Sequence, residues 1–117
     1  MLPETVKSKL LITQFLEKHI IVRAHLPGVF FGICKDIMPN PDGTVNVILA
    51  ESRQLWEWWT PVGQGVAGVA EHGLAQNHSV HVGALRSELQ HISGVFQMDI
   101  CTAVAVKSIQ SRASVQS

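Results

Sequence analysis

The sequence predicts an α+β fold with an N-terminal helix, a mostly antiparallel β-sheet or small partly open barrel, and short helices after the sheet core. Three observations predict it: an apolar stripe at helical spacing near the N-terminus, several β-branched runs separated by turn residues, and a late short segment with a capping residue. The 117 residues fit one domain, which we place over residues 1–117.

The first predicted element is a helix over residues 4–18. Pro3 suits a first helical turn, where the missing N–H is no loss. Apolar side chains then recur at helical spacing and form one stripe, at Val6, Leu10, Leu11, Phe15 and Leu16.

A β-rich core follows, over about residues 19–101. Pro27-Gly28 ends the first run, and Asp42-Gly43 suits a tight turn that joins the second and third runs as a hairpin. Thr102 is placed to cap a last helix over about 102–110, before a polar, frayed tail. The expected strands are 19–26, 29–38, 44–50, 53–59, 79–82 and 94–100, with a short helix at 66–74.

The charge composition bounds the function. Lys+Arg and Asp+Glu are equal at 9 each, so the formal net charge is zero and a dedicated DNA or RNA binder is not expected. Charged residues make up only 15% of the chain, which is compatible with a homo-oligomer that covers part of its apolar surface.

The two cysteines, Cys34 and Cys101, are too few for a disulfide framework and indicate reduced thiols in a cytosol. No apolar run reaches the roughly 18 residues that a membrane span needs. No basic region followed by an apolar signal core opens the chain, so we expect a cytoplasmic protein without a membrane partner.

All three tryptophans lie in the run 52–59, together with Arg53. Strand alternation would place Trp56 and Trp58 on one face, with Arg53 and Trp59 on the other. Tryptophan and arginine dominate binding hot spots, and the segment therefore indicates a pocket or a protein interface. Core packing for Trp56, with Trp58 or Trp59 at a subunit interface, stays an open alternative.

Arg53 and Arg23 are the best candidates to contact an anion, because a guanidinium grips phosphate or carboxylate through two N–H groups. For Arg23 alone, a solvent-facing strand surface is the favoured interpretation. The glycines of the run 28–32, Gly-Val-Phe-Phe-Gly, would allow close approach of a ligand, but a turn glycine followed by a strand with one packed phenylalanine is the favoured interpretation.

The sequence gives little support to catalysis or metal binding. The six histidines include no His-Glu-x-x-His pattern, and His78 and His81 would face opposite sides of a strand. The acids are scattered singly, and neither cysteine has a nucleophile signature. We therefore expect no enzyme, no metal and no cofactor.

The chain resembles a group of small bacteriophage proteins built on a strand, Gly-Val-x-x-Gly, a second strand, and then Arg-x-x-Trp-x-Trp. This group is the Thoeris anti-defence family of phage sponge proteins, and the resemblance covers about residues 20–110. The motifs that carry it are Ile21-Val22-Arg23, Gly28-Val29-Phe30-Phe31-Gly32, Ser52-Arg53-Gln54-Leu55-Trp56-Glu57-Trp58, Gly73, Cys101-Thr102 and Ala105-x-Lys107-Ser108-Ile109.

The resemblance implies an oligomeric protein in the host bacterial cytoplasm that sequesters a cyclic nucleotide signal without cleaving it. The signal would be cyclic ADP-ribose-like or a cyclic oligonucleotide. The implied ligand-binding residues are Arg23, Arg53, Trp56 and Trp58, with Phe30 or Phe31 as stacking neighbours. The helix before residue 19 and the additional Trp59 depart from the pattern. The alternative is a phage inhibitor that binds a host defence protein directly, of the anti-restriction or anti-CRISPR type.

Overall fold

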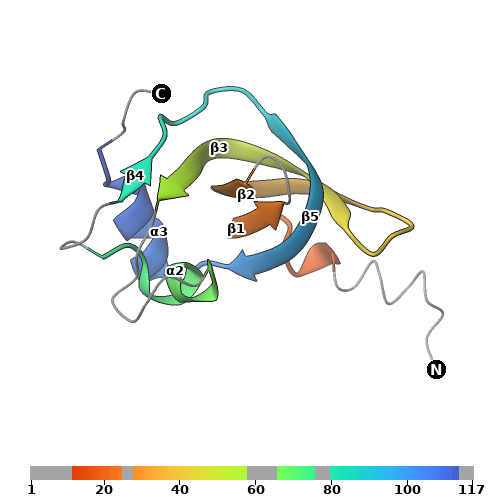
Figure 1. The fold of residues 1–117 in the computed structure, drawn as a ribbon, viewed down its shortest axis with the longest axis horizontal. Helices are drawn as coiled ribbons and strands as arrows, with labels where there is room; N and C mark the ends of the chain where they lie inside the picture. Colours follow the sequence, from red (N-terminus) through yellow and green to blue (C-terminus); the bar gives the residue numbers. More distant parts are fainter. Residues whose placement is uncertain (1–11, 25–27, 58–65, 76–79, 114–117) are drawn as a thin grey trace.

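The computed structural model describes residues 12–24, 28–57, 66–75 and 80–113. Within them, every strand pairing is antiparallel, and two short helices accompany the sheet, which confirms the α+β class (Figure 1). The elements in chain order are β1 (His19–Ala24), β2 (Gly28–Pro39), β3 (Val45–Glu57), α2 (Val66–His72), β4 (His81–Val82), β5 (Gln90–Ile100) and α3 (Ala103–Gln110).

Four strands close into a ring. β1 pairs with β2 and β5, and β3 pairs with the same two strands, so the sheet is a small barrel to which β4 adds an extra strand on β3. The inward-facing side chains fill the barrel and form the first core, which consists of Ile20, Val22, Ala24, Phe30, Cys34, Ile37, Val47, Leu49, Ile92 and Val95.

β2 and β3 are long and bent, and each contributes side chains both to the barrel core and to a second core outside the barrel. Glu51 has a φ of +50°, and the β2–β3 register shifts beside it, between Phe31 and Ile33. Gly32 of β2 lies against β3 at this bend. A Cβ at residue 32 would lie 3.0 Å from the carbonyl oxygen of Ala50, so the two backbones approach closely here. The predicted strand 44–50 and the described part of the predicted strand 53–59, which ends at Glu57, are therefore one bulged strand, because the chain bends there and keeps its pairing with β2.

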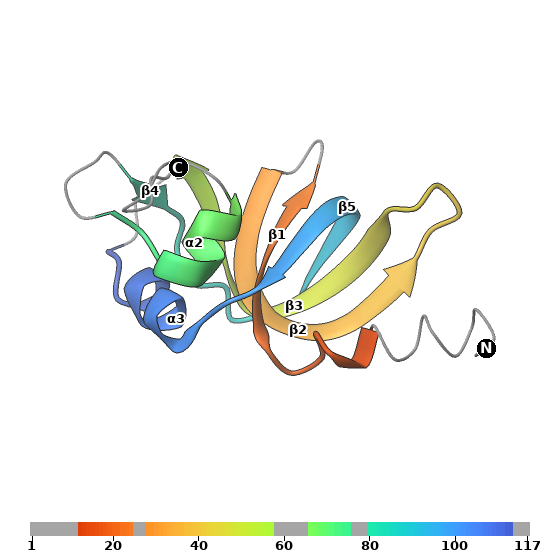
Figure 2. The same ribbon diagram turned by 90° about the horizontal axis from the view of Figure 1, so that it is seen from below.

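A second core lies outside the barrel, between the sheet and the two helices (Figure 2). The hydroxyl of Thr102 accepts from the N–H of Ala105, which confirms it as the cap of α3. α2 ends at His72 rather than at residue 74. The second core consists of Ile21, Val29, Phe31, Leu55, Val66, Val69, Ala70, Leu74, Val82 and Ile109.

The N-terminal helix predicted over 4–18 lies mostly outside the described residues, and its predicted end is wrong. Helical backbone is present at residues 12–13 and turns follow over 14–17, where Glu17 adopts a φ of +64°. Phe15 and Leu16 still pack against the barrel core, so their apolar spacing reflects burial in a turn. β5 begins at Gln90, four residues before the start of the predicted strand, because residues 90–92 already pair with β3 before the register shift next to Gly94.

Along the described parts of the chain, no helix is both long and apolar enough to cross a membrane.

Candidate functional site

Arg53, the strongest predicted anion contact, lies inside the molecule with 4% of its surface exposed. Its Nε donates to the carbonyl of Gly83 at 2.8 Å, and Nη1 donates to the carbonyl of Ile109 at 2.7 Å. Burial lowers the pKa of Arg53 from its ordinary value. These two hydrogen bonds tie β3 to the segment after β4 and to the last turn of α3.

The two phenylalanines of the glycine-flanked run lie on opposite faces of β2. Phe30 fills the barrel, and Phe31 belongs to the second core. Phe31 is the register partner of Arg53, so these two predicted residues are side by side. Both phenylalanine side chains are buried, at 4% and 1% exposure.

The remaining predicted residues are exposed or outside the described chain. The guanidinium carbon of Arg23 lies 5.9 Å from the ring centroid of Phe96, itself 46% exposed. Trp56 is 43% exposed while its neighbour Leu55 is buried, which confirms the predicted alternation here. Trp58 lies outside the described residues. Among the predicted residues that the structure describes, Phe31 and Arg53 share a position in the ladder, whereas Arg23 and Trp56 lie on the surface.

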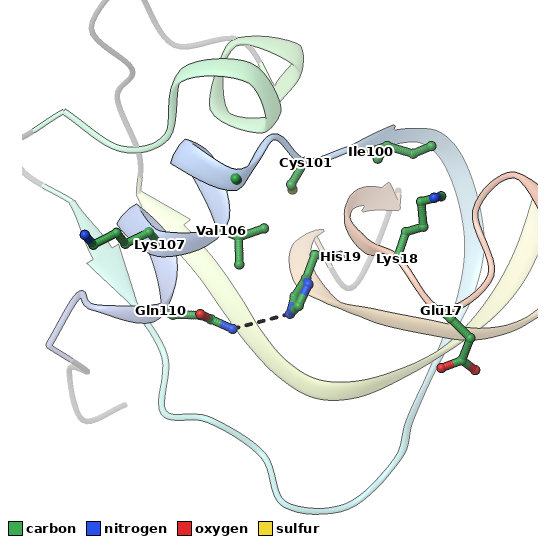
Figure 3. Close-up of a pocket in the computed structure, with 9 residues that line it drawn as sticks. Glu17, Lys18, His19, Ile100, Cys101, Val106, Lys107 and Gln110 are labelled. Carbon is green, nitrogen blue, oxygen red and sulfur yellow. Dashed lines mark hydrogen bonds between the residues drawn. The ribbon is translucent and has the colours of Figure 1, made fainter.

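A pocket lies elsewhere, between the turn before β1, the end of β5 and one side of α3 (Figure 3). Its volume is about 410 Å³, within the range of small-molecule sites. The lining residues are Glu17, Lys18, His19, Ile100, Cys101, Ala103, Val106, Lys107 and Gln110.

Helical periodicity explains how α3 contributes to this pocket. Four of its residues, at positions 103, 106, 107 and 110, have the i, i+3, i+4, i+7 spacing of one helix face and line the pocket. Ala105 and Ile109 lie on another face and are fully buried. Arg53 binds the carbonyl of Ile109. One buried guanidinium thus holds the helix that supplies almost half of the pocket lining.

His19, the first residue of β1, is the central polar group. Its imidazole stacks on Phe31 with ring centroids 5.5 Å apart and planes 18° apart. Its Nε2 lies 3.3 Å from Nε2 of Gln110, as Figure 3 shows. The amide nitrogen of Gln110 can only donate, so Nε2 of His19 is the acceptor in this contact. Phe31, predicted as a stacking residue, thus supports a pocket residue from behind.

The electrostatics of the pocket favour an anion and disfavour thiol chemistry. Burial, and to a lesser degree the charge of Asp99, raises the pKa of the Cys101 thiol to about 12, so this thiol stays protonated at neutral pH. Lys18 and Lys107 outnumber Glu17, whose carboxylate pairs with Lys35 at 2.7 Å on the surface.

Noncovalent binding is the chemistry that this arrangement suits. The described residues contain no group of three or more His, Cys, Asp or Glu that could hold a metal ion. The pocket offers an apolar wall, one imidazole and two ammonium groups. Sequence reasoning missed Lys18, His19 and Gln110. Cys101 and Lys107 fall inside the motifs of the resemblance. The helical spacing of residues 103, 106, 107 and 110 is the sequence signal that could have identified the α3 side of the pocket.

The fold and the pocket define a small β-barrel protein with two helices on its outer face. The chain belongs to a family described as a domain of unknown function, DUF6948, whose profile matches residues 17–109. The matched range contains all of the pocket lining except Gln110. No curated protein and no solved structure matches the chain.

Proposed function

We propose that this protein binds a cyclic nucleotide signal and sequesters it without cleaving it, as a phage counter-defence sponge in a bacterial cytoplasm. The observation that carries the binding proposal is the pocket beside His19, which combines two lysines with an apolar wall. Lysine ammonium groups attract phosphate, and the side chains of Ile100 and Val106 offer apolar contact to a base or ribose. The nucleotide identity of the ligand comes from the resemblance.

Binding without turnover fits the chemistry of the lining. The Cys101 thiol is protonated, and Nε2 of His19 contacts the side-chain amide of Gln110. A bound phosphodiester would therefore meet charges that hold it, and no activated nucleophile among the described lining residues. The ligand is expected to leave the protein chemically unchanged.

Thermal melting against a panel of cyclic mono- and dinucleotides and cyclic ADP-ribose isomers tests the proposal. A ligand that binds only the folded state, present at about a hundredfold its Kd, adds roughly 2.7 kcal/mol and raises the Tm. Gln110→Ala is expected to reduce this shift. Val104→Ala, a matched change on the exposed side of the same helix, is expected to keep it. Release by heating should return the ligand intact, and a hydrolysed product would exclude a sponge.

A second candidate is an inhibitor that binds a host protein. The exposed Trp56 and the Arg23–Phe96 pair favour it, because exposed tryptophan and arginine are typical hot spots. It predicts a stable complex with one host protein that Trp56→Ala weakens, and no Tm shift with any nucleotide. Self-association into a homo-oligomer is part of both proposals, and sedimentation velocity measures it directly.

A further inference from the structure

Phe31 on β2 and Arg53 on β3 are partners in the sheet ladder, and each holds a different side of the pocket. Phe31 is 1% exposed and stacks on His19, with ring centroids 5.5 Å apart and an angle of 18° between the planes. Arg53, also buried, donates from Nη1 to the carbonyl of Ile109 at 2.7 Å, one residue before Gln110. Two neighbouring buried residues therefore hold two wall segments that are 91 positions apart in the chain.

The two wall segments meet at one polar contact. Nε2 of His19 lies 3.3 Å from Nε2 of Gln110, and both residues line the pocket, as Figure 3 shows. Gln110 is exposed, so its long side chain gives up rotamer freedom to keep this contact. The contact therefore depends on how firmly the imidazole and the last turn of α3 are held from behind.

We propose that Phe31 and Arg53 are the positioning residues of the pocket, one for each side, and that together they set the spacing between His19 and Gln110. Neither of them lines the pocket, so they act on a bound molecule only through those two side chains. Stacking fixes the plane of the imidazole, and the charged hydrogen bond fixes the end of α3. In its consequence for ligand affinity, this positioning rests on the proposed function.

Nuclear magnetic resonance of the full chain tests the positioning without any ligand. At about pH 8.5 an ordinary imidazole is neutral, and one whose Nε2 accepts carries its proton on Nδ1. The ¹⁵N signals of His19 should therefore show a single tautomer in the parent and a mixture of two in Phe31→Leu. Phe30→Leu is the matched control, because Phe30 is also buried but faces the barrel core. It should leave the His19 signals as they are in the parent.

Arg53→Lys tests the other side of the pocket. A lysine keeps the charge but lacks the fork of N–H groups that reaches two carbonyls, so the last turn of α3 should shift. The His19 signals should again show two tautomers, while the ring-current shift that Phe31 imposes on His19 persists. In Phe31→Leu that ring-current shift should vanish. If Arg53→Lys fails to fold, Phe31→Leu judged against Phe30→Leu decides alone.

Two results would overturn the positioning role. One is a single His19 tautomer, as in the parent, in Phe31→Leu. The other is an equal change of the His19 signals in Phe30→Leu, because it would mean that any loss of core volume disturbs the imidazole.

Titration calorimetry on the same variants, with a cyclic dinucleotide and cyclic ADP-ribose as probes, measures the consequence for binding. Phe31→Leu should weaken the bound probe on the order of tenfold, whereas Phe30→Leu should keep its affinity within about twofold. Equal affinity in the parent and Phe31→Leu would overturn the role of Phe31 in binding. If the parent bound neither probe, the proposed function would fail, while the resonance experiment would still decide the positioning.

Discussion

The guanidinium of Arg53 and the carbonyl oxygen of Ile109, 56 positions apart in the chain, are joined by a 2.7 Å hydrogen bond inside the protein. The last carbonyls of a helix have no partner within it, and a charged donor is a strong substitute. The same guanidinium binds the carbonyl of Gly83. Arg53 thus holds α3 against β3. Because α3 forms one wall of the pocket, Arg53 also holds that wall in place.

Arg53→Met should destabilise the fold strongly. The change keeps a long apolar stem but leaves the carbonyl of Gly83 without its donor, at a cost of about 1–3 kcal/mol, and leaves the carbonyl of Ile109 with backbone donors only, such as the N–H of Arg112 at 3.3 Å. We expect a loss of about 2–5 kcal/mol, measured by urea unfolding. Arg23→Met, on the exposed surface, is the control and should cost under about 1 kcal/mol. Equal losses for the two variants would contradict a structural role of Arg53.

Gly73→Ala should destabilise the contact between the two helices. Gly73 has a φ of +80°, and a Cβ there would lie 2.6 Å from the Cβ of Ser108 on α3. Gly43 has a similar φ of +90° with open space around it, so Gly43→Ala reports the backbone cost alone, about 1 kcal/mol. We expect Gly73→Ala to lower the free energy of unfolding by clearly more than Gly43→Ala. Equal losses would mean that the two helices separate without cost.

The fold class and most of the elements could be predicted because they depend on local signals. Asp42 and Gly43 form the predicted hairpin turn, in which the Asp42 carboxylate accepts from the N–H of Thr44 at 2.9 Å. Thr102 caps α3 as expected. The closure of the barrel could not be predicted, because it depends on β5 pairing with both β1 and β3, which lie far from it in the chain. The sequence analysis expects two strands where the structure has one bent strand, β3. The bend lies at Glu51, whose positive φ no local sequence signal announced.

The candidate site was predicted poorly for a physical reason. Arginine and phenylalanine are the residues expected to bind ligands. In this chain, however, Arg53 is buried and donates to two backbone carbonyls, and Phe31 packs in the second core. The pocket residues instead come from three distant segments, with Lys18 and His19 near one end of the chain and Lys107 near the other. Only the folded barrel brings those segments together, so no local motif reports their proximity.

Stability should fall at alkaline pH through the buried cysteines. Burial raises the pKa of Cys101 from 9.0 to about 12 and that of Cys34 to about 11, so the folded state resists losing these protons. The stabilisation is complete below pH 9, where both states keep the thiols protonated, and declines as the pH rises through the folded values. Urea unfolding at pH 8 and 10.5 should show a smaller loss in Cys101→Ala than in the parent. The chain has no tyrosine to obscure this difference.

Thr102→Ala should loosen α3 from both of its attachments. The Thr102 hydroxyl accepts from the N–H of Ala105 at 3.2 Å and donates to the carbonyl of Glu71 at 2.6 Å, so one oxygen caps the start of α3 and binds the end of α2. Loss of a helix cap costs about 0.5–2 kcal/mol, and the second hydrogen bond places the expected loss toward the upper end of that range. Thr102→Ser keeps the hydroxyl and should retain most of the stability in urea unfolding. If Thr102→Ser lost as much as Thr102→Ala, the methyl group rather than the hydroxyl would hold this junction.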